Sequence, residues 1–111
     1  MPEDTQTPIR QVVFDSPGPG WHAGADFRQQ PGVGDHVAHY AKLFAQGKLE
    51  LGGPFMIEDV GGTMISVPGL SSEELKAFAG EDPAVRSGLL TYAVRPWYAA
   101  MDSRHAGMPD V

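Results

Sequence analysis

Clusters of glycine and proline divide this chain into short segments, which limits it to a small domain of short strands and helices. The sequence has 14 Gly and 10 Pro among 111 residues, and both residue types interrupt regular structure. Residues 16–20, Ser-Pro-Gly-Pro-Gly, therefore predict a loop. Residues 21–34 have little periodicity and predict a longer loop or a short helical piece, either a lid or an ordered surface connection. A chain of this length forms one domain.

Four of the remaining segments have the composition of strands. Residues 9–15 contain Val-Val-Phe, which suits a pleated surface. Residues 49–52 and 63–67 flank a Gly-Gly turn and predict a hairpin. Residues 89–98 form the last expected strand, because their apolar side chains alternate between two sides.

Residues 35–46 predict the clearest helix. Asp35 is suited to the N-cap position because its carboxylate can accept an otherwise unpaired backbone N–H, and Gly47 gives a stop signal. The expected apolar face has four members at helical spacing: Val37, Tyr40, Ala41 and Phe44.

A second helix is expected to begin at Ser71 and end at Gly80. Ser71 and Glu74 have the spacing of a capping box, in which each side chain satisfies a backbone N–H near the other. Asp82-Pro83 then predicts a short helical turn, with aspartate as the cap and proline in the first position.

The order of these elements is β, α, β, β, α, β, which predicts an α+β fold of the ferredoxin-like βαββαβ type with an antiparallel sheet. When helices cover one face of such a sheet, the other face is bare. A second copy of the chain is the simplest cover, so a homodimer is expected.

Composition excludes several classes of function. The net charge is −6, with 8 Lys and Arg scattered among 14 Asp and Glu, which disfavours nucleic acid and anionic membranes as partners. No Cys is present, so thiolate catalysis and Cys-ligated metal sites are excluded. The polar, acidic start at residues 1–6 does not look like a signal peptide. We therefore expect a cytoplasmic protein.

Two groups of short motifs, one around the first helix and one before the last strand, follow a recognisable order. In the first group, His36 lies at the start of the helix, and Lys-Leu and Gly-Gly-Pro-Phe follow at 48–49 and 52–55. In the second, Glu-Asp-Pro-Ala-Val at 81–85 precedes Val-Arg-Pro-Trp at 94–97. This order resembles the YCII-related domain family over most of the chain.

The resemblance implies a dimeric α+β barrel in which a cleft holds a His and an Asp, and by motif these are His36 and Asp82. Some relatives resemble dehydrochlorinases of chlorinated hydroquinones, and the fold resembles muconolactone isomerases. The family domain would cover 9–99, with flexible tails at 1–8 and 100–111. The insertion at 16–34 departs from the pattern.

His36 and Asp82 each have an ordinary structural interpretation beside the functional one. The positive end of the helix dipole should lower the pKa of His36 and keep it neutral as a general base; otherwise it is a packing residue at a helix start. Asp82 is either a common helix cap or the group that orients His36 by accepting its ring N–H. One carboxylate oxygen could serve each role.

Four further residues are candidates for substrate binding. His39 is three positions from His36 and could share its helix face; with no third ligand evident, a rim residue is favoured over a metal site. Gly53, Pro54 and Phe55 follow a strand without the Lys and Ser or Thr of a phosphate loop. They are expected near the cleft, with Phe55 in its wall.

Two functions fit these residues. The first is a lyase or isomerase that moves a proton on a small ring or carbonyl compound, with His36 as general base or acid and Asp82 orienting it, without a cofactor or metal. The alternative is a non-catalytic module that binds a small ligand, or another protein, through the same cleft.

Overall fold

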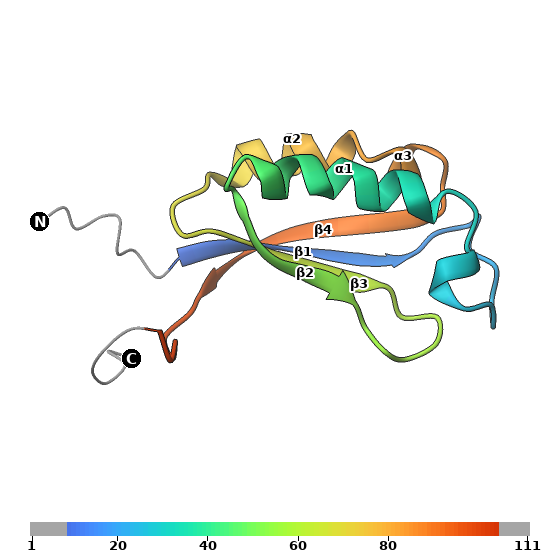
Figure 1. The fold of residues 1–111 in the computed structure, drawn as a ribbon, viewed down its shortest axis with the longest axis horizontal. Helices are drawn as coiled ribbons and strands as arrows, with labels where there is room; N and C mark the ends of the chain where they lie inside the picture. Colours follow the sequence, from blue (N-terminus) through green and yellow to red (C-terminus); the bar gives the residue numbers. More distant parts are fainter. Residues whose placement is uncertain (1–8, 105–111) are drawn as a thin grey trace, which may run out of the picture.

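A four-stranded antiparallel sheet with its three α-helices on one face forms the domain (Figure 1). The structure is a computed structural model and describes residues 9–104. Its strands are β1 (Ile9–Pro17), β2 (Leu49–Pro54), β3 (Gly62–Ser66) and β4 (Leu90–Tyr98). Its helices are the 3-10 helix η2 (Phe27–Gln29), α1 (Val33–Ala45), α2 (Ser72–Gly80) and α3 (Pro83–Arg86).

The spatial order of the strands is β2-β3-β1-β4, and every neighbouring pair is antiparallel. The two central strands, β1 and β3, are consecutive in space but are separated in sequence by α1 and β2. The expected βαββαβ order and antiparallel sheet are therefore confirmed.

Three element boundaries differ by two residues from the sequence-based predictions, and one of them is the end of β2 at Pro54. β1 continues through Ser16 and Pro17, which pair with β4, because a proline at the end of a ladder loses little by lacking an N–H. α1 begins at Val33, with Gly32 as its N-cap at φ 89°. This left-handed conformation suits glycine, and the helix therefore begins directly after Gly32. Asp35, the predicted cap, lies instead in the first turn of the helix.

The N-cap bonds of Ser71 and Asp82, predicted for the second half of the chain, are present, whereas the Glu74 carboxylate of the expected capping box pairs with Lys48. The Ser71 hydroxyl accepts the Glu74 backbone N–H, and the Asp82 carboxylate accepts that of Ala84. Ser71 thereby starts α2, and Asp82 starts α3 directly beside the N-terminal half of α1.

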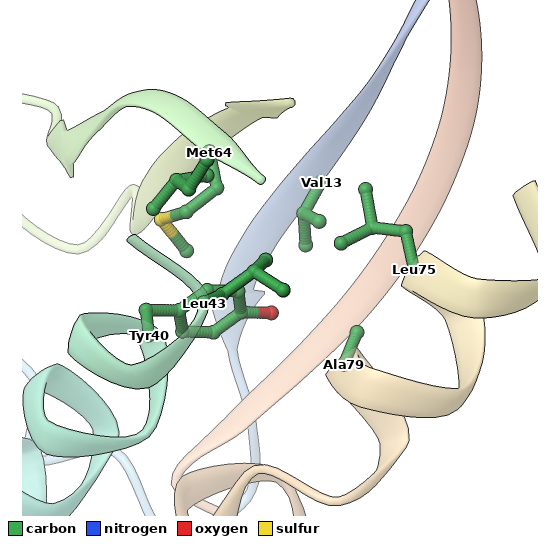
Figure 2. Close-up of a cluster of buried hydrophobic side chains, with 7 residues drawn as sticks. Val13, Tyr40, Leu43, Met64, Leu75 and Ala79 are labelled. Atoms are coloured by element: carbon green, nitrogen blue, oxygen red, sulfur yellow. The ribbon is translucent and has the colours of Figure 1, made fainter. Parts of the chain in front are cut away.

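The main hydrophobic core lies between the sheet and helices α1 and α2 (Figure 2). Val13 of β1 is at its centre, with side chains from both helices around it. The members of this cluster are Val13, Tyr40, Leu43, Leu49, Met64, Leu75 and Ala79. Their burial removes apolar surface from water and fixes the helices on this face.

The opposite face of the sheet carries large apolar side chains that the described chain leaves exposed. Strand alternation places Phe14 on this face, because its neighbour Val13 lies in the core. Trp97 and Leu51 share the face by register, and their exposures are 47% and 60%. The sheet therefore has one face covered by helices and one apolar face without helices.

The expected tails lie largely outside the described residues, at 1–8 and 105–111. Arg104 is described and forms ion pairs with Glu50 and Asp102. None of the helices within 9–104 has the length and apolar character needed to cross a membrane.

Candidate active site

A cavity of about 470 Å³ lies between α1, the strand ends and the loop that follows β1. One wall is the apolar face predicted for the first helix, since Val37, Tyr40, Ala41 and Phe44 all line the cavity. Val37 and Phe44 are 61% and 62% exposed, so most of this apolar face opens onto the cavity and does not pack in the core. The buried residues of the helix are His39, Tyr40 and Leu43.

The hairpin of β2 and β3 forms the opposite wall with its backbone close to β1. Gly61 is at φ +101°, and a Cβ there would lie 2.0 Å from the carbonyl oxygen of Asp15. Only glycine permits this approach. Other lining residues of the hairpin are Gly52, Gly53, Pro54, Gly62 and Met64.

The loop after β1 is ordered and supplies a third wall through Trp21, Phe27 and Arg28. The Trp21 Nε1–H donates to Asp59 Oδ1 at 2.8 Å, and the Gly24 N–H donates to the same oxygen at 3.0 Å. These two bonds lower the pKa of Asp59 and tie the loop to the β2–β3 hairpin. The segment 18–32 is thus part of the cavity and not only a surface connection.

His36 and Asp82 meet at the inner side of this cavity. His36 Nδ1 is 2.6 Å from Asp82 Oδ2, while Asp82 Oδ1 accepts the Ala84 N–H at 2.9 Å. Asp82 is fully buried and His36 lines the cavity. One carboxylate therefore caps α3 with one oxygen and contacts the imidazole of α1 with the other. Because Asp82 is an acceptor, the neutral imidazole carries its proton on Nδ1 and leaves Nε2 free.

The expectation of a lowered pKa for His36 is wrong. Burial does lower the pKa of His36, but the hydrogen bond that His36 donates to Asp82 and the charges of Asp82 and Asp15 outweigh burial and leave the pKa raised. A direct contact with a buried carboxylate stabilises imidazolium more strongly than a helix dipole destabilises it.

Asp15 is a third polar residue of the site, and sequence reasoning missed it. It lies on β1 at 3% exposure, and neither carboxylate oxygen has a hydrogen-bond partner within the described residues. Its Oδ2 is 3.8 Å from His36 Nε2. Burial raises the pKa of Asp15 to about 7, although the nearby His36 opposes this rise. A signal was available, because strand alternation puts Asp15 on the same face as Val13.

The remaining candidates divide between the cavity and the interior. Gly53 and Pro54 line the cavity, as expected, whereas Phe55 lies outside its lining. His39 is not a rim residue. It is 5% exposed, its Nε2 is 2.7 Å from the carbonyl oxygen of Phe78, and its ring stacks on Phe78. Its position three residues after His36 turns it toward α2, because that spacing does not quite complete a helical turn.

No group of three or more His, Asp or Glu side chains within residues 9–104 is arranged to hold a metal ion. Two carboxylates flank His36 instead: Asp82 is hydrogen-bonded to Nδ1, and Asp15 faces Nε2. This arrangement can hold and move a proton.

Comparison with solved structures finds a similar fold in 5-chloro-2-hydroxyhydroquinone dehydrochlorinase from Burkholderia phenoliruptrix AC1100, solved in complex with 2,5-dihydroxybenzoquinone. The TM-score is 0.55 and the identity 23%, over 79% of this chain and 92% of that one. No family model matches the sequence, and no curated protein matches it either. The likeness confirms the small α+β fold that was predicted from the sequence.

Proposed function

We propose that this protein is a small-molecule lyase or isomerase of the YCII-related type, in which His36 is the general base. The observation that carries the proposal is the 2.6 Å contact between His36 Nδ1 and the fully buried Asp82, at the wall of an apolar cavity. An imidazole is an effective base when its own proton is held on one ring nitrogen, so that the other nitrogen can accept a proton, and when the imidazolium form is stabilised. Asp82 meets both needs.

The proposed chemistry is removal of a proton from carbon next to a carbonyl or ring hydroxyl. His36 Nε2 takes the proton, and Asp82 stabilises the resulting imidazolium without taking the proton itself. This proton transfer uses side chains of the protein alone and is common to isomerisation and to elimination.

The cavity supports a small, largely apolar substrate. Aromatic and aliphatic side chains supply most of its lining, and the volume of about 470 Å³ is in the range of small-ligand sites. The structurally similar protein is a dehydrochlorinase solved with a dihydroxyquinone, an analogy that favours a ring compound with oxygen substituents.

The proposal is tested by deuterium exchange into 2-tetralone, a neutral ring ketone, followed by proton NMR in D₂O near pH 7. The native protein should accelerate loss of the α-proton signals over buffer and over heat-denatured protein. A thermal-shift measurement with the same ketone separates the alternatives, since a bound ligand stabilises the fold. Stabilisation without exchange would favour the non-catalytic binding module over the enzyme.

We further propose that the exposed sheet face pairs with a second copy of the chain. The face carries Phe14, Leu51 and Trp97, all at least 40% exposed, and large apolar patches of this kind mark interfaces. Light scattering should give twice the chain mass of 11.9 kDa. Trp97→Glu should yield monomers, whereas Ala77→Glu, on the exposed side of α2, should leave the dimer intact. A monomeric native protein at micromolar concentration would contradict this pairing.

A further inference from the structure

We propose that Asp15 is the second catalytic residue of this site, a general acid that protonates a substrate oxygen while His36 removes a proton from carbon. The inference rests on the proposed function, because it concerns the same cavity. It adds the group that donates a proton to the substrate oxygen, where negative charge develops. His36 and Asp15 together then form an acid–base pair.

The surroundings of Asp15 are unusual for a structural carboxylate. Buried carboxylates are normally hydrogen-bonded, as Asp82 is, yet neither oxygen of Asp15 has a hydrogen-bond partner within residues 9–104. Asp15 lines the cavity, and the 3.8 Å between its Oδ2 and His36 Nε2 is too long for a hydrogen bond. A substrate that reaches both groups would satisfy the buried oxygens.

Burial makes the protonated acid the favourable form of Asp15, and it outweighs the opposing charge effect of His36. Asp82, before α3, adds negative charge, while His36 of α1 opposes it. Tyr40 of α1 is buried and neutral, since its pKa is raised by burial and by the charges of Asp15 and Asp82. Tyr92 lies opposite Asp15 on β4. Burial therefore raises the pKa of Asp15 to about 7 even with His36 beside it, so a share of Asp15 keeps its proton at neutral pH.

The proposed step is an enolisation with two proton transfers. His36 Nε2 takes the α-proton, and the C–H electron pair becomes the C=C bond as the carbonyl π pair moves to oxygen. That oxygen takes the Asp15 proton, so the O–H bond of Asp15 breaks as the enol O–H bond forms. His36 is left as imidazolium and Asp15 as carboxylate. Transfer of the Nε2 proton across to Asp15, after a small side-chain movement, restores the starting forms.

Carboxyl carbon NMR of the native protein, labelled with ¹³C at Asp Cγ, tests the acid without any substrate. One aspartate should titrate near pH 7, and its signal should be missing in Asp15→Asn. Asp35→Asn is the matched control, because it removes an exposed aspartate beside His36 in sequence and should leave that signal unchanged. If every aspartate titrates below about pH 5, Asp15 is ionised at neutral pH and the inference is overturned.

The 2-tetralone exchange assay tests the catalytic role. Asp15→Asn keeps the shape of the side chain but has no transferable acid proton, so kcat should fall by roughly 10²-fold with KM little changed. In the native enzyme the exchange rate should fall above pH 7, where Asp15 loses its proton. This fall should be absent in Asp15→Asn. Full activity with an unchanged pH profile in Asp15→Asn would overturn the role of Asp15 and leave His36 as base. A native protein without exchange activity would overturn the proposed function and the role of Asp15 with it.

Discussion

Replacement of His36 by Gln should lower the rate of 2-tetralone exchange by roughly 10³-fold, in the range that a positioned general base contributes. Glutamine approximates the polarity of the imidazole but cannot take up a proton. His36 lies at the cavity wall and is only partly buried, so the variant should fold. Ketone binding, measured by thermal shift, should therefore change much less than the rate.

His22→Gln is the matched control for this experiment. His22 lies in the loop after β1 with an exposed side chain, so the same substitution there should leave exchange at the native rate. A His36→Gln protein that retains native kcat/KM would remove His36 from the mechanism. Loss of activity in both variants would point to a general effect on folding, which far-ultraviolet circular dichroism would detect.

Replacement of Asp82 by Asn should lower the pKa of His36 by at least about one unit, because removal of an adjacent carboxylate typically shifts a pKa by one to three units. Asparagine is as good an N-cap as aspartate, so α3 should still begin at residue 83. The variant therefore separates the two roles of Asp82. Proton NMR titration of the histidines, with His36 assigned from His36→Gln, measures the shift.

The same variant should change stability in a pH-dependent manner. A raised pKa in the folded state stabilises the protein fully below the unfolded His pKa of about 6.5, and this stabilisation is lost as the pH rises through the folded value. The difference in unfolding free energy between native protein and Asp82→Asn should thus be larger at pH 5 than at pH 9. Urea denaturation at both pH values measures it. An unchanged His36 pKa and a pH-independent difference would reduce Asp82 to a helix cap.

The local pattern of the sequence predicted most of the secondary structure, because short-range chemistry controls it. Ser71 and Asp82 cap helices through bonds to residues two or three positions ahead, and such bonds need no distant partner. The start of α1 was the exception. Both Gly32 and Asp35 can begin a helix, and the path of the loop before α1 decides between them.

The site was predictable only in part. The motif order indicated His36 and Asp82 as candidates, and in the structure His36 Nδ1 lies 2.6 Å from Asp82 Oδ2. Asp15 was treated as the end of a strand, although the alternation of β1 already placed it on the inner face. His39 was misplaced because a helical spacing does not specify what packs on each side of the helix, and α2 covers that side through Phe78.

The sequence by itself determined the order of strands and helices and the caps of α2 and α3, and it indicated the two residues, His36 and Asp82, that we propose for proton transfer. These follow from propensities, capping bonds and motif order, which act over a few residues. Only the tertiary structure decided that Asp15 faces His36, that His36 is more basic than its helix position suggests, and that the apolar face of α1 lines a cavity. All three depend on how elements that are distant in the chain pack together, and the raised pKa of His36 also depends on the charges that this packing brings close.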